Sequence, residues 1–255
     1  MITVKSAKEI KILKEGGKIL ASVLREVEKN VRPGVATIEL DELAEKLIRR
    51  AGGEPSFKNY KTRDDRIPYP ASLCVSINDE VVHGIPSKEK ILIEGDIVGL
   101  DLGMKYKGLY TDMATTAPVG EIDVKAKELI KETKEALKKG IKEAREGNRI
   151  GDISFAVQKY IEKNKFSVIR NLAGHGVGYK VHEEPEIPNF GKKGVGEILK
   201  KGMILAIEPM VTTGRHEIIL DDDNWTWRTK DGSLSAHFEH TIVVAKKGGE
   251  VLTKG

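Results

Sequence analysis

One short segment of this chain, LDLGMKYKGLYTD, predicts a β-hairpin that carries an aspartate on each strand. A turn centred between Tyr106 and Lys107, with a glycine beside it to relax the backbone, would join the two strands. In an antiparallel hairpin with that centre, Asp101 lies directly opposite Asp112, and both carboxylates leave the same face of the sheet about 5 Å apart. Two such carboxylates repel unless one is protonated or a cation lies between them. We interpret the pair as a metal site.

Three residues further along the chain complete a set of candidate metal ligands. His175 lies between two glycines, Glu208 ends one apolar run, and Glu239 precedes another. A charged residue at the end of a buried strand is costly unless it is paired or coordinates something. Four carboxylates carry more charge than one divalent ion balances, so we expect two ions. Oxygen donors with one imidazole suit Co, Mn, Fe or Zn, and the ligand types do not choose among these metals.

The composition excludes several classes of protein. The chain has 255 residues, enough to bury roughly 70–75% of its unfolded surface, and its single cysteine, Cys74, cannot form an intramolecular disulfide. No signal-peptide stretch opens the sequence, and no apolar run approaches the ~20 residues of a membrane span. We therefore expect a cytoplasmic protein without a membrane partner.

The charge is mild and mixed, with 43 basic and 39 acidic residues giving a net charge of +4. Lysine clusters at residues 138–139 and 200–201 are typical of solvated faces, so we predict no specific nucleic-acid partner. Lysine and glutamate are abundant, whereas Gln158 is the one glutamine. That bias is described for thermophile proteins, and it predicts a heat-adapted source.

The apolar periodicity predicts a mixed α/β (α+β) architecture. A second helix is expected to begin at a Thr37 cap and to end at a glycine pair. Residues 34–48 also align loosely with residues 147–161, at an offset of 113, which indicates two related halves. The other predicted helices are residues 7–31, 124–145 and 153–164, and the predicted strands are residues 73–77, 97–104 and 109–118.

Besides the hairpin, five short segments carry a family resemblance: SINDEVVHG (76–84), GHGVG (174–178), HEEP (182–185), EP (208–209) and EHT (239–241). Taken together and in order, the hairpin and these segments resemble the methionine aminopeptidases of the type I class. The 31 residues from Glu208 to Glu239 leave no room for the helical insertion of type II enzymes. No extension with metal-binding cysteines precedes the first helix, so we expect the compact form without an N-terminal zinc extension.

The resemblance implies a pseudo-symmetric "pita-bread" fold. In that fold a central antiparallel sheet is covered by helices, and a dinuclear metal site lies between the two halves of one catalytic domain, here residues 1–255. It also implies a monomer that removes the initiator methionine from nascent proteins and peptides with a small second residue. Because the family acts on nascent chains, a surface patch that contacts the ribosome is an open alternative, which the composition itself does not show.

The resemblance further implies a role for each metal ligand. Asp112 and Glu239 would bridge the two metals and Asp101 would chelate one of them. His175 and Glu208 would complete the other site. A metal-bridging hydroxide would attack the scissile carbonyl, with Glu208 as the general base.

Two histidines and three pocket residues complete the implied site. His83 and His182 match positions that contact the scissile amide or the tetrahedral intermediate, where a hydrogen bond is worth a few kcal/mol. Tyr69, Cys74 and Trp225 match the wall of the methionine pocket, with Trp225 at its rim.

Some residues lie outside this pattern. His237 and His240 flank Glu239 and are expected to orient it or to pack beside it, and His216 is expected to be an ordinary loop histidine. The stretch RDDRIP (63–68) and Val181 depart from the common family pattern. Both departures fall in the wall of the methionine pocket, so which residues contact the methionine side chain is an open question.

Several alternatives remain at this point. A proline-directed aminopeptidase usually carries an additional N-terminal domain, for which the residues before the catalytic region leave too little length. A non-catalytic binding module of the same fold loses metal ligands, whereas all five candidate ligands are present here. A dimetal phosphoesterase would bring a glycine-rich phosphate loop or an arginine cluster, and neither accompanies these carboxylates. A thiol nucleophile at Cys74, paired with His83, has no evident third group to orient it.

Overall fold

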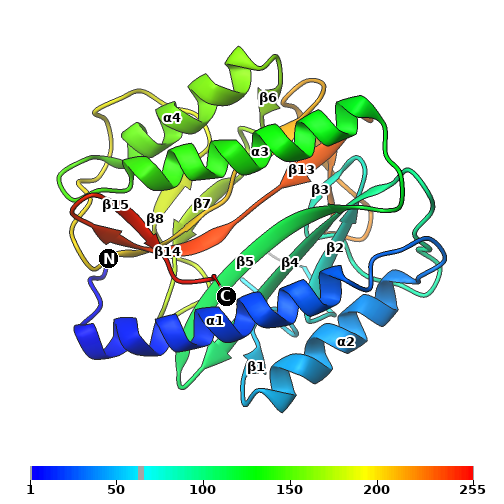
Figure 1. The fold of residues 1–255 in the computed structure, drawn as a ribbon, viewed down its shortest axis with the longest axis horizontal. Helices are drawn as coiled ribbons and strands as arrows, with labels where there is room; N and C mark the ends of the chain where they lie inside the picture. Colours follow the sequence, from blue (N-terminus) through cyan, green and yellow to red (C-terminus); the bar gives the residue numbers. More distant parts are fainter. Residues whose placement is uncertain (1, 63–65, 255) are drawn as a thin grey trace.

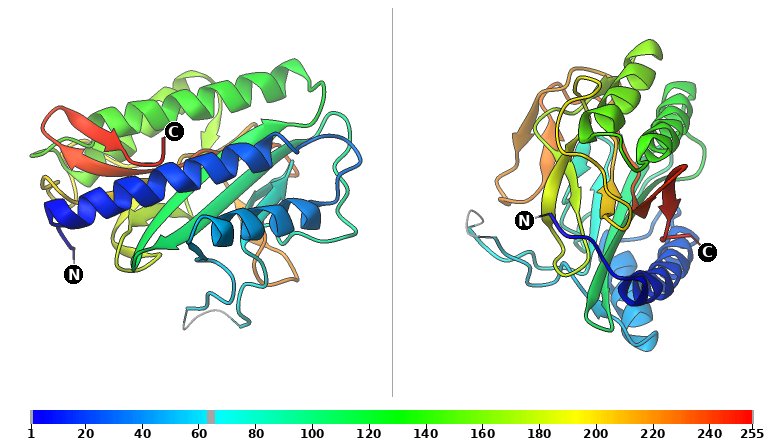
Figure 2. Two further views of the ribbon diagram at one scale, coloured as in Figure 1. Left: turned by 60° about the horizontal axis from the view of Figure 1, so that its bottom comes forward. Right: turned by 90° about the vertical axis from the view of Figure 1, so that its left-hand side faces the viewer.

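Two helix pairs lie over a set of antiparallel strands in this protein, whose structure is a computed structural model that describes residues 2–62 and 66–254. One pair, α1 and α2, crosses the two longest strands, and the other, α3 and α4, lies over the C-terminal strands (Figure 1). Figure 2 shows both pairs from two further directions. The helices are α1 (Ala7–Glu28), α2 (Thr37–Arg50), α3 (Val124–Glu143) and α4 (Ile150–Lys163).

The described strands form four sheets, and every strand pairing in them is antiparallel. In the four-stranded sheet, β4 (Ile97–Tyr106) pairs with β1 (Glu54–Pro55), β2 (Leu73–Ile77) and β5 (Leu109–Pro118). The five-stranded sheet has the order β15 (Gly248–Val251), β14 (His240–Ala245), β9 (Ile204–Ile207), β7 (Ala173–Gly176), β8 (Glu183–Pro188). The three-stranded sheets are β13 (Ser235–His237), β10 (Met210–Thr212), β6 (Ser167–Val168), and β11 (Ile218–Leu220), β12 (Trp227–Thr229), β3 (Glu80–Val82).

The predicted repeat is present at the predicted offset. Helices α2 and α4 each have 14 residues, and each begins 113 positions from the other, at residues 37 and 150. Gly34 and Gly147 precede them with φ of 87° and 89°, a left-handed conformation that glycine adopts without strain. The backbone N–H groups of Ala36 and Arg149 each donate to an acidic side chain three residues ahead. The two-half architecture predicted from the sequence is therefore confirmed.

The start of α2 differs from the prediction. Ala36, and not Thr37, is the N-cap, and Thr37 is the first helical residue. The Thr37 hydroxyl donates to the Ser87 carbonyl (3.1 Å) and accepts from the Ser87 N–H (2.9 Å), so it is unavailable to the helix. Helix α4 likewise begins earlier than predicted, because Asp152 caps the N–H of Arg149.

The register of the β4–β5 hairpin also differs from the prediction. Asp101 pairs with Ala114, and Asp112 pairs with Gly103, so the two aspartates are diagonal neighbours. The loop residues are Lys107 and its following glycine, with φ of 48° and 85°, as a two-residue turn matching the strand twist requires. The turn is centred one residue later than predicted, so each residue pairs with a partner two positions further along the chain. A shift of two positions keeps both aspartates on one face of the sheet.

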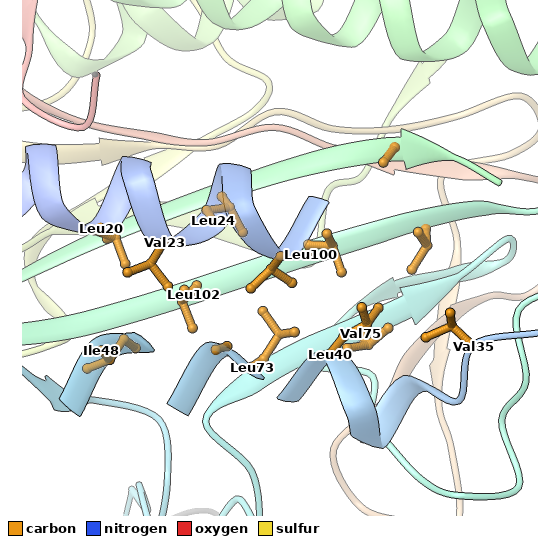
Figure 3. Close-up of a cluster of buried hydrophobic side chains, with 14 of the residues drawn as sticks. Leu20, Val23, Leu24, Val35, Leu40, Ile48, Leu73, Val75, Leu100 and Leu102 are labelled. Atoms are coloured by element: carbon orange, nitrogen blue, oxygen red, sulfur yellow. The ribbon is translucent and has the colours of Figure 1, made fainter. Parts of the chain in front are cut away.

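Each helix pair covers its own hydrophobic core. Figure 3 shows the core between α1, α2 and the strands β2 and β4, where Leu24, Leu40 and Leu100 are fully buried. A separate cluster beneath α3 and α4 includes Ile153 and Leu205 and supports the five-stranded sheet. A further buried cluster joins α1 and β5 to β9 and β14, so apolar packing also connects the two halves.

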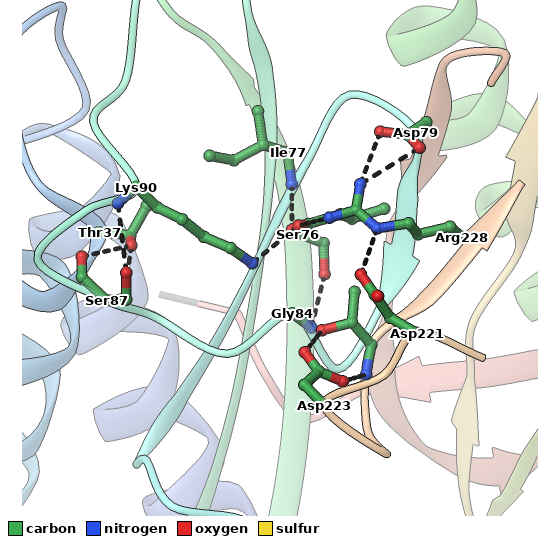
Figure 4. A network of polar contacts seen from close by, with 12 residues as sticks. Thr37, Ser76, Ile77, Asp79, Gly84, Ser87, Lys90, Asp221, Asp223 and Arg228 are labelled. Carbon is green, nitrogen blue, oxygen red and sulfur yellow. Dashed lines mark hydrogen bonds and ion pairs between the residues drawn. The ribbon is translucent and has the colours of Figure 1, made fainter.

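Arg228 on β12 connects three acidic side chains (Figure 4). Its guanidinium lies 3.0 Å from Asp79 Oδ1, 2.8 Å from Glu80 Oε1 and 2.6 Å from Asp221 Oδ2. Glu80 is buried and also accepts from Lys90 Nζ at 2.7 Å. A buried carboxylate needs such partners, because water no longer solvates it.

This network fixes two segments at the edge of the cavity described below. Glu80 begins β3, after which His83 follows, and Asp221 begins the turn that carries Trp225. The rings of His83 and Trp225 lie 6.0 Å apart, edge to face. Arg228 therefore joins the two segments that bring these rings together.

None of the helices in the described part of the chain combines the length and apolar character that a bilayer crossing requires.

We predict that Arg228→Met lowers the free energy of unfolding by about 2 kcal/mol, because Glu80 loses one of its two cationic partners while it stays buried. For a chain of this size the loss corresponds to about 4–8 °C in Tm, which thermal unfolding followed by circular dichroism would detect. The control is Arg49→Met, since the Arg49–Glu45 pair is solvent-exposed and worth less than about 0.5 kcal/mol. Equal losses in the two variants would contradict the prediction.

Candidate metal centre

A cavity of about 980 Å³ lies at the junction of the two halves. Its lining combines carboxylates and imidazoles with an aromatic wall. All ten residues predicted for the site line it: Tyr69, Cys74, His83, Asp101, Asp112, His175, His182, Glu208, Trp225 and Glu239.

The four carboxylates reach the cavity from both halves of the chain. Asp101 and Asp112 come from β4 and β5, whereas Glu208 follows β9 and Glu239 precedes β14. Ala114 and Glu239 exchange backbone hydrogen bonds of 3.0 and 3.4 Å, which joins β5 to the segment before β14.

A threonine hydroxyl reinforces that junction. Thr241 Oγ1 accepts from the N–H of Asp112 and donates to its carbonyl, both at 2.8 Å. The hydroxyl is buried, so both bonds form away from water. The backbone of one aspartate is thus fixed by the half of the chain that supplies the glutamates.

The donor atoms of this cluster fit a cation. One donor atom each from Asp112, His175 and Glu239 lie within 4.8 Å of one another, and all three residues are buried. Asp101 Oδ1 and Glu239 Oε1 are buried without a hydrogen-bond partner among the described residues. A buried carboxylate oxygen without a donor is costly unless a proton or a metal ion satisfies it. Hard oxygen donors with one imidazole are ligands that divalent transition metals accept.

The pKa values of the four carboxylates also indicate a cation site. Burial raises the pKa of Asp112 to about 7 and that of Glu208 to about 8. Burial, followed by the negative charge of Asp112, also raises the pKa of both Asp101 and Glu239. The four groups cannot all ionise together without a cation, and bound metal would displace their protons.

His175 is held close to the sheet in its neutral form. A Cβ at Gly174 would lie 2.5 Å from the Ala206 carbonyl oxygen, and one at Gly176 would lie 2.2 Å from that of Glu184. These approaches explain why glycines flank the histidine. Burial lowers the pKa of His175 to about 3, so its ring is neutral, as metal ligation requires.

Sequence reasoning missed Tyr60, a residue of the cavity lining. Its hydroxyl lies 2.6 Å from Nδ1 of His182, whose ring packs edge to face on His175 with centroids 4.4 Å apart. No local pattern around Tyr60 signals this contact, which spans 122 positions of the sequence.

The aromatic wall contains Phe57, Tyr69 and Trp225, which line the cavity together with Cys74. Val181 belongs to the same buried cluster but not to the cavity lining. Trp225 lines the cavity and is 8% exposed, and its Nε1 donates to the Ile67 carbonyl. Of the stretch RDDRIP, residues 63–65 lie outside the described residues.

Cys74 lies within this wall and is 3% exposed. Burial raises the pKa of its thiol, with a further contribution from the negative charge of Asp101. The thiolate is the nucleophilic form, so this environment does not support a Cys74 nucleophile.

Each of the remaining histidines lies near a side chain that the sequence did not predict. Nε2 of His237 lies 3.4 Å from Glu208 Oε2, so His237 approaches a different glutamate from the one it flanks. His240 Nδ1 lies 3.0 Å from Thr253 Oγ1. His216 lies 3.7 Å from Glu217, outside the cavity lining.

The sequence of this chain matches metallopeptidase family M24 over residues 11–246. It is 46% identical over 253 residues to a methionine aminopeptidase of Clostridium acetobutylicum, covering 99% of each chain. It is 45% identical over 254 residues to methionine aminopeptidase 1 of Bacillus subtilis, covering 100% of each.

The fold is similar to solved structures from the same family. A crystal structure of methionine aminopeptidase from Thermotoga maritima matches with a TM-score of 0.96 and 46% identity, covering 100% of both chains. An Xaa-Pro dipeptidase from Bacillus anthracis matches with a TM-score of 0.78 and 27% identity, over 99% of this chain and 62% of the dipeptidase. These matches confirm the predicted resemblance and the pita-bread architecture, and the chain belongs to metallopeptidase family M24.

Proposed function

We propose that this chain is a methionine aminopeptidase, which removes the initiator methionine from nascent proteins and peptides with a small second residue. One observation carries the proposal. The cavity places unsatisfied, buried carboxylate oxygens beside an apolar wall that could hold a methionine side chain. The full-length relatives named methionine aminopeptidase support the same activity.

The proposed cofactor is a pair of divalent ions, drawn from Co, Mn, Fe and Zn. Asp101, Asp112, His175, Glu208 and Glu239 would hold them. When bound, such ions polarise a carbonyl and make water a nucleophile at neutral pH. Four carboxylates in one buried cluster support two ions, because one divalent ion leaves two negative charges unbalanced.

The protein's own groups supply the remaining chemistry. Glu208 is the proposed general base, because bound metal would displace its proton and the free carboxylate could take a proton from water and pass it to the leaving amine. His182 and His83 would donate hydrogen bonds to the scissile amide as charge develops on it. Tyr69, Cys74 and Trp225 would bind the methionine side chain through apolar contact.

The finer aspects of this function are also proposals. We propose one catalytic domain over residues 1–255 that acts as a monomer in the cytoplasm on nascent chains. The apolar cluster shared by the two halves supports one domain, as does the ligand set, which neither half contains completely. Direct binding measurements with ribosomes would test whether the chain contacts them.

The test is hydrolysis of Met-Ala-Ser and Ile-Ala-Ser by protein that is stripped with a chelator and reloaded with Co, Mn, Fe or Zn. We expect metal-restored cleavage of the methionine peptide only. Cleavage of a Met-Pro dipeptide in its place would favour the proline-directed activity named for the Bacillus anthracis relative. No cleavage of any peptide by folded, metal-loaded protein would favour a binding module.

We predict that Glu208→Gln lowers kcat for Met-Ala-Ser by about 10²–10⁴-fold, because the amide cannot accept the proton. The measurement is steady-state turnover at matched metal content, determined by elemental analysis. Glu217→Gln is the control, since Glu217 is exposed and lies outside the cavity lining. A Glu208 variant that keeps wild-type turnover would disprove the assignment of the base.

We predict that metal-free protein loses stability between pH 7 and pH 9. Glu208 has a pKa of about 8 in the folded chain and an ordinary value of 4.5, so the folded state holds a proton that the unfolded state has released. That stability is fully present below pH 4.5 and is lost as the pH rises through 8.

Chemical denaturation at the two pH values would measure the change. We expect Glu208 alone to contribute a fall of about 1 kcal/mol in the free energy of unfolding. In Glu208→Gln, the free energy of unfolding should fall by about 1 kcal/mol less than in wild type between the same two pH values. Saturating metal should reverse the trend, because metal competes with protons for the same oxygens. An equal fall in both proteins would contradict the pKa assigned to Glu208.

A further inference from the structure

The two carboxylate oxygens of Glu208 lie between two imidazoles. Nε2 of His175 is 3.4 Å from Oε1, and Nε2 of His237 is 3.4 Å from Oε2. His175 shares its donor cluster with Asp112 and Glu239, so Oε1 is the Glu208 oxygen that lies beside a member of that cluster. The second oxygen, Oε2, faces His237.

His237 is held firmly in this position. It is 3% exposed and belongs to β13, where it pairs with Met210 two residues after Glu208. Thr116 Oγ1 accepts from the N–H of His237 (2.9 Å) and donates to its carbonyl (2.8 Å). The backbone of His237 is therefore fixed from both a neighbouring strand and a side chain of β5.

The ring of His237 presents an unsatisfied donor position to Glu208. Its Nε2 is buried and has no hydrogen-bond partner within the described part of the chain. A charge-assisted N–H···O bond is about 2.7–2.9 Å long, so a small movement of the Glu208 side chain would form one. An imidazole can donate from Nε2 in its neutral form and in its charged form.

We propose that His237 is a positioning residue that donates from Nε2 to Oε2 of Glu208 and so directs Oε1 to the metal. Without this bond the carboxylate could rotate and present either oxygen, or both, to the metal. The inference rests on the proposed role of Glu208 as a metal ligand. His237 itself is not one of the proposed metal ligands.

The chain provides a matched control in His240. This histidine also flanks Glu239 and is mostly buried, but its Nδ1 lies 3.0 Å from Thr253 Oγ1. Replacing either histidine removes a buried ring from the same short segment. Only the replacement of His237 removes a donor that faces a proposed ligand.

The test compares His237→Leu, His237→Gln and His240→Leu as chelator-stripped proteins titrated with Mn²⁺ by isothermal titration calorimetry. Loss of a group that orients a ligand typically weakens metal affinity by about 10–100-fold, and we expect that loss in His237→Leu. The Gln variant should restore Mn²⁺ affinity to within a few-fold of wild type, because its amide N–H can reach the same oxygen. His240→Leu should also bind Mn²⁺ nearly as tightly as wild type, even if its Tm falls.

Three results would overturn the proposal. They are an unchanged Mn²⁺ affinity in His237→Leu, an equal weakening in His237→Gln, and an equal weakening in His240→Leu. If the Leu variant does not fold, His237→Met carries the same comparison, since methionine fills irregular space and has no donor.

The titration contains no peptide, so it separates this proposal from the proposed function. Wild-type protein that binds Mn²⁺ but does not cleave Met-Ala-Ser would refute the function and leave the positioning role to be decided by the variants. Wild-type protein that binds none of Mn²⁺, Co²⁺, Fe²⁺ and Zn²⁺ in the same titration would refute both.

Discussion

The energetic problem on which this structure depends is the burial of four carboxyl groups in one cavity. Desolvation alone raises the pKa of Glu208 to about 8, and the negative charge of Asp112 adds to the effect of burial on the pKa of Asp101. Only a scaffold that is stable elsewhere can keep such groups together. Here the two helix-covered cores supply that stability, and the strands that they support carry the carboxylates.

The two-half organisation determines how the carboxylates meet. Apolar packing between α1, β5, β9 and β14 joins the two halves, and the position of Asp112 relative to Glu239 is fixed at this junction. There the paired backbone bonds of Ala114 and Glu239, with the hydroxyl of Thr241, add direction to the side-chain packing. Directional hydrogen bonds suit that task, because they fix angle as well as distance.

Much of the site could be predicted from the sequence because its signals are local. The side-chain period of a strand is two residues, so Asp101 and Asp112 remain on one face even though the predicted turn was displaced by one position. The partners of Thr37, Tyr60 and His237 could not be predicted. Each depends on a residue far away in the sequence, and local pattern does not show which way a hydroxyl or ring turns.

The junction between the halves also has a kinetic consequence. Because the carboxylates are divided between β4–β5 and the segments around β9 and β14, separation of the halves would divide the ligand set. The same separation would expose the apolar cluster that joins α1 and β5 to β9 and β14. Release of a bound ion by this route would therefore require a rare sub-global opening, and the exchange rate of the ion would report how often that junction opens.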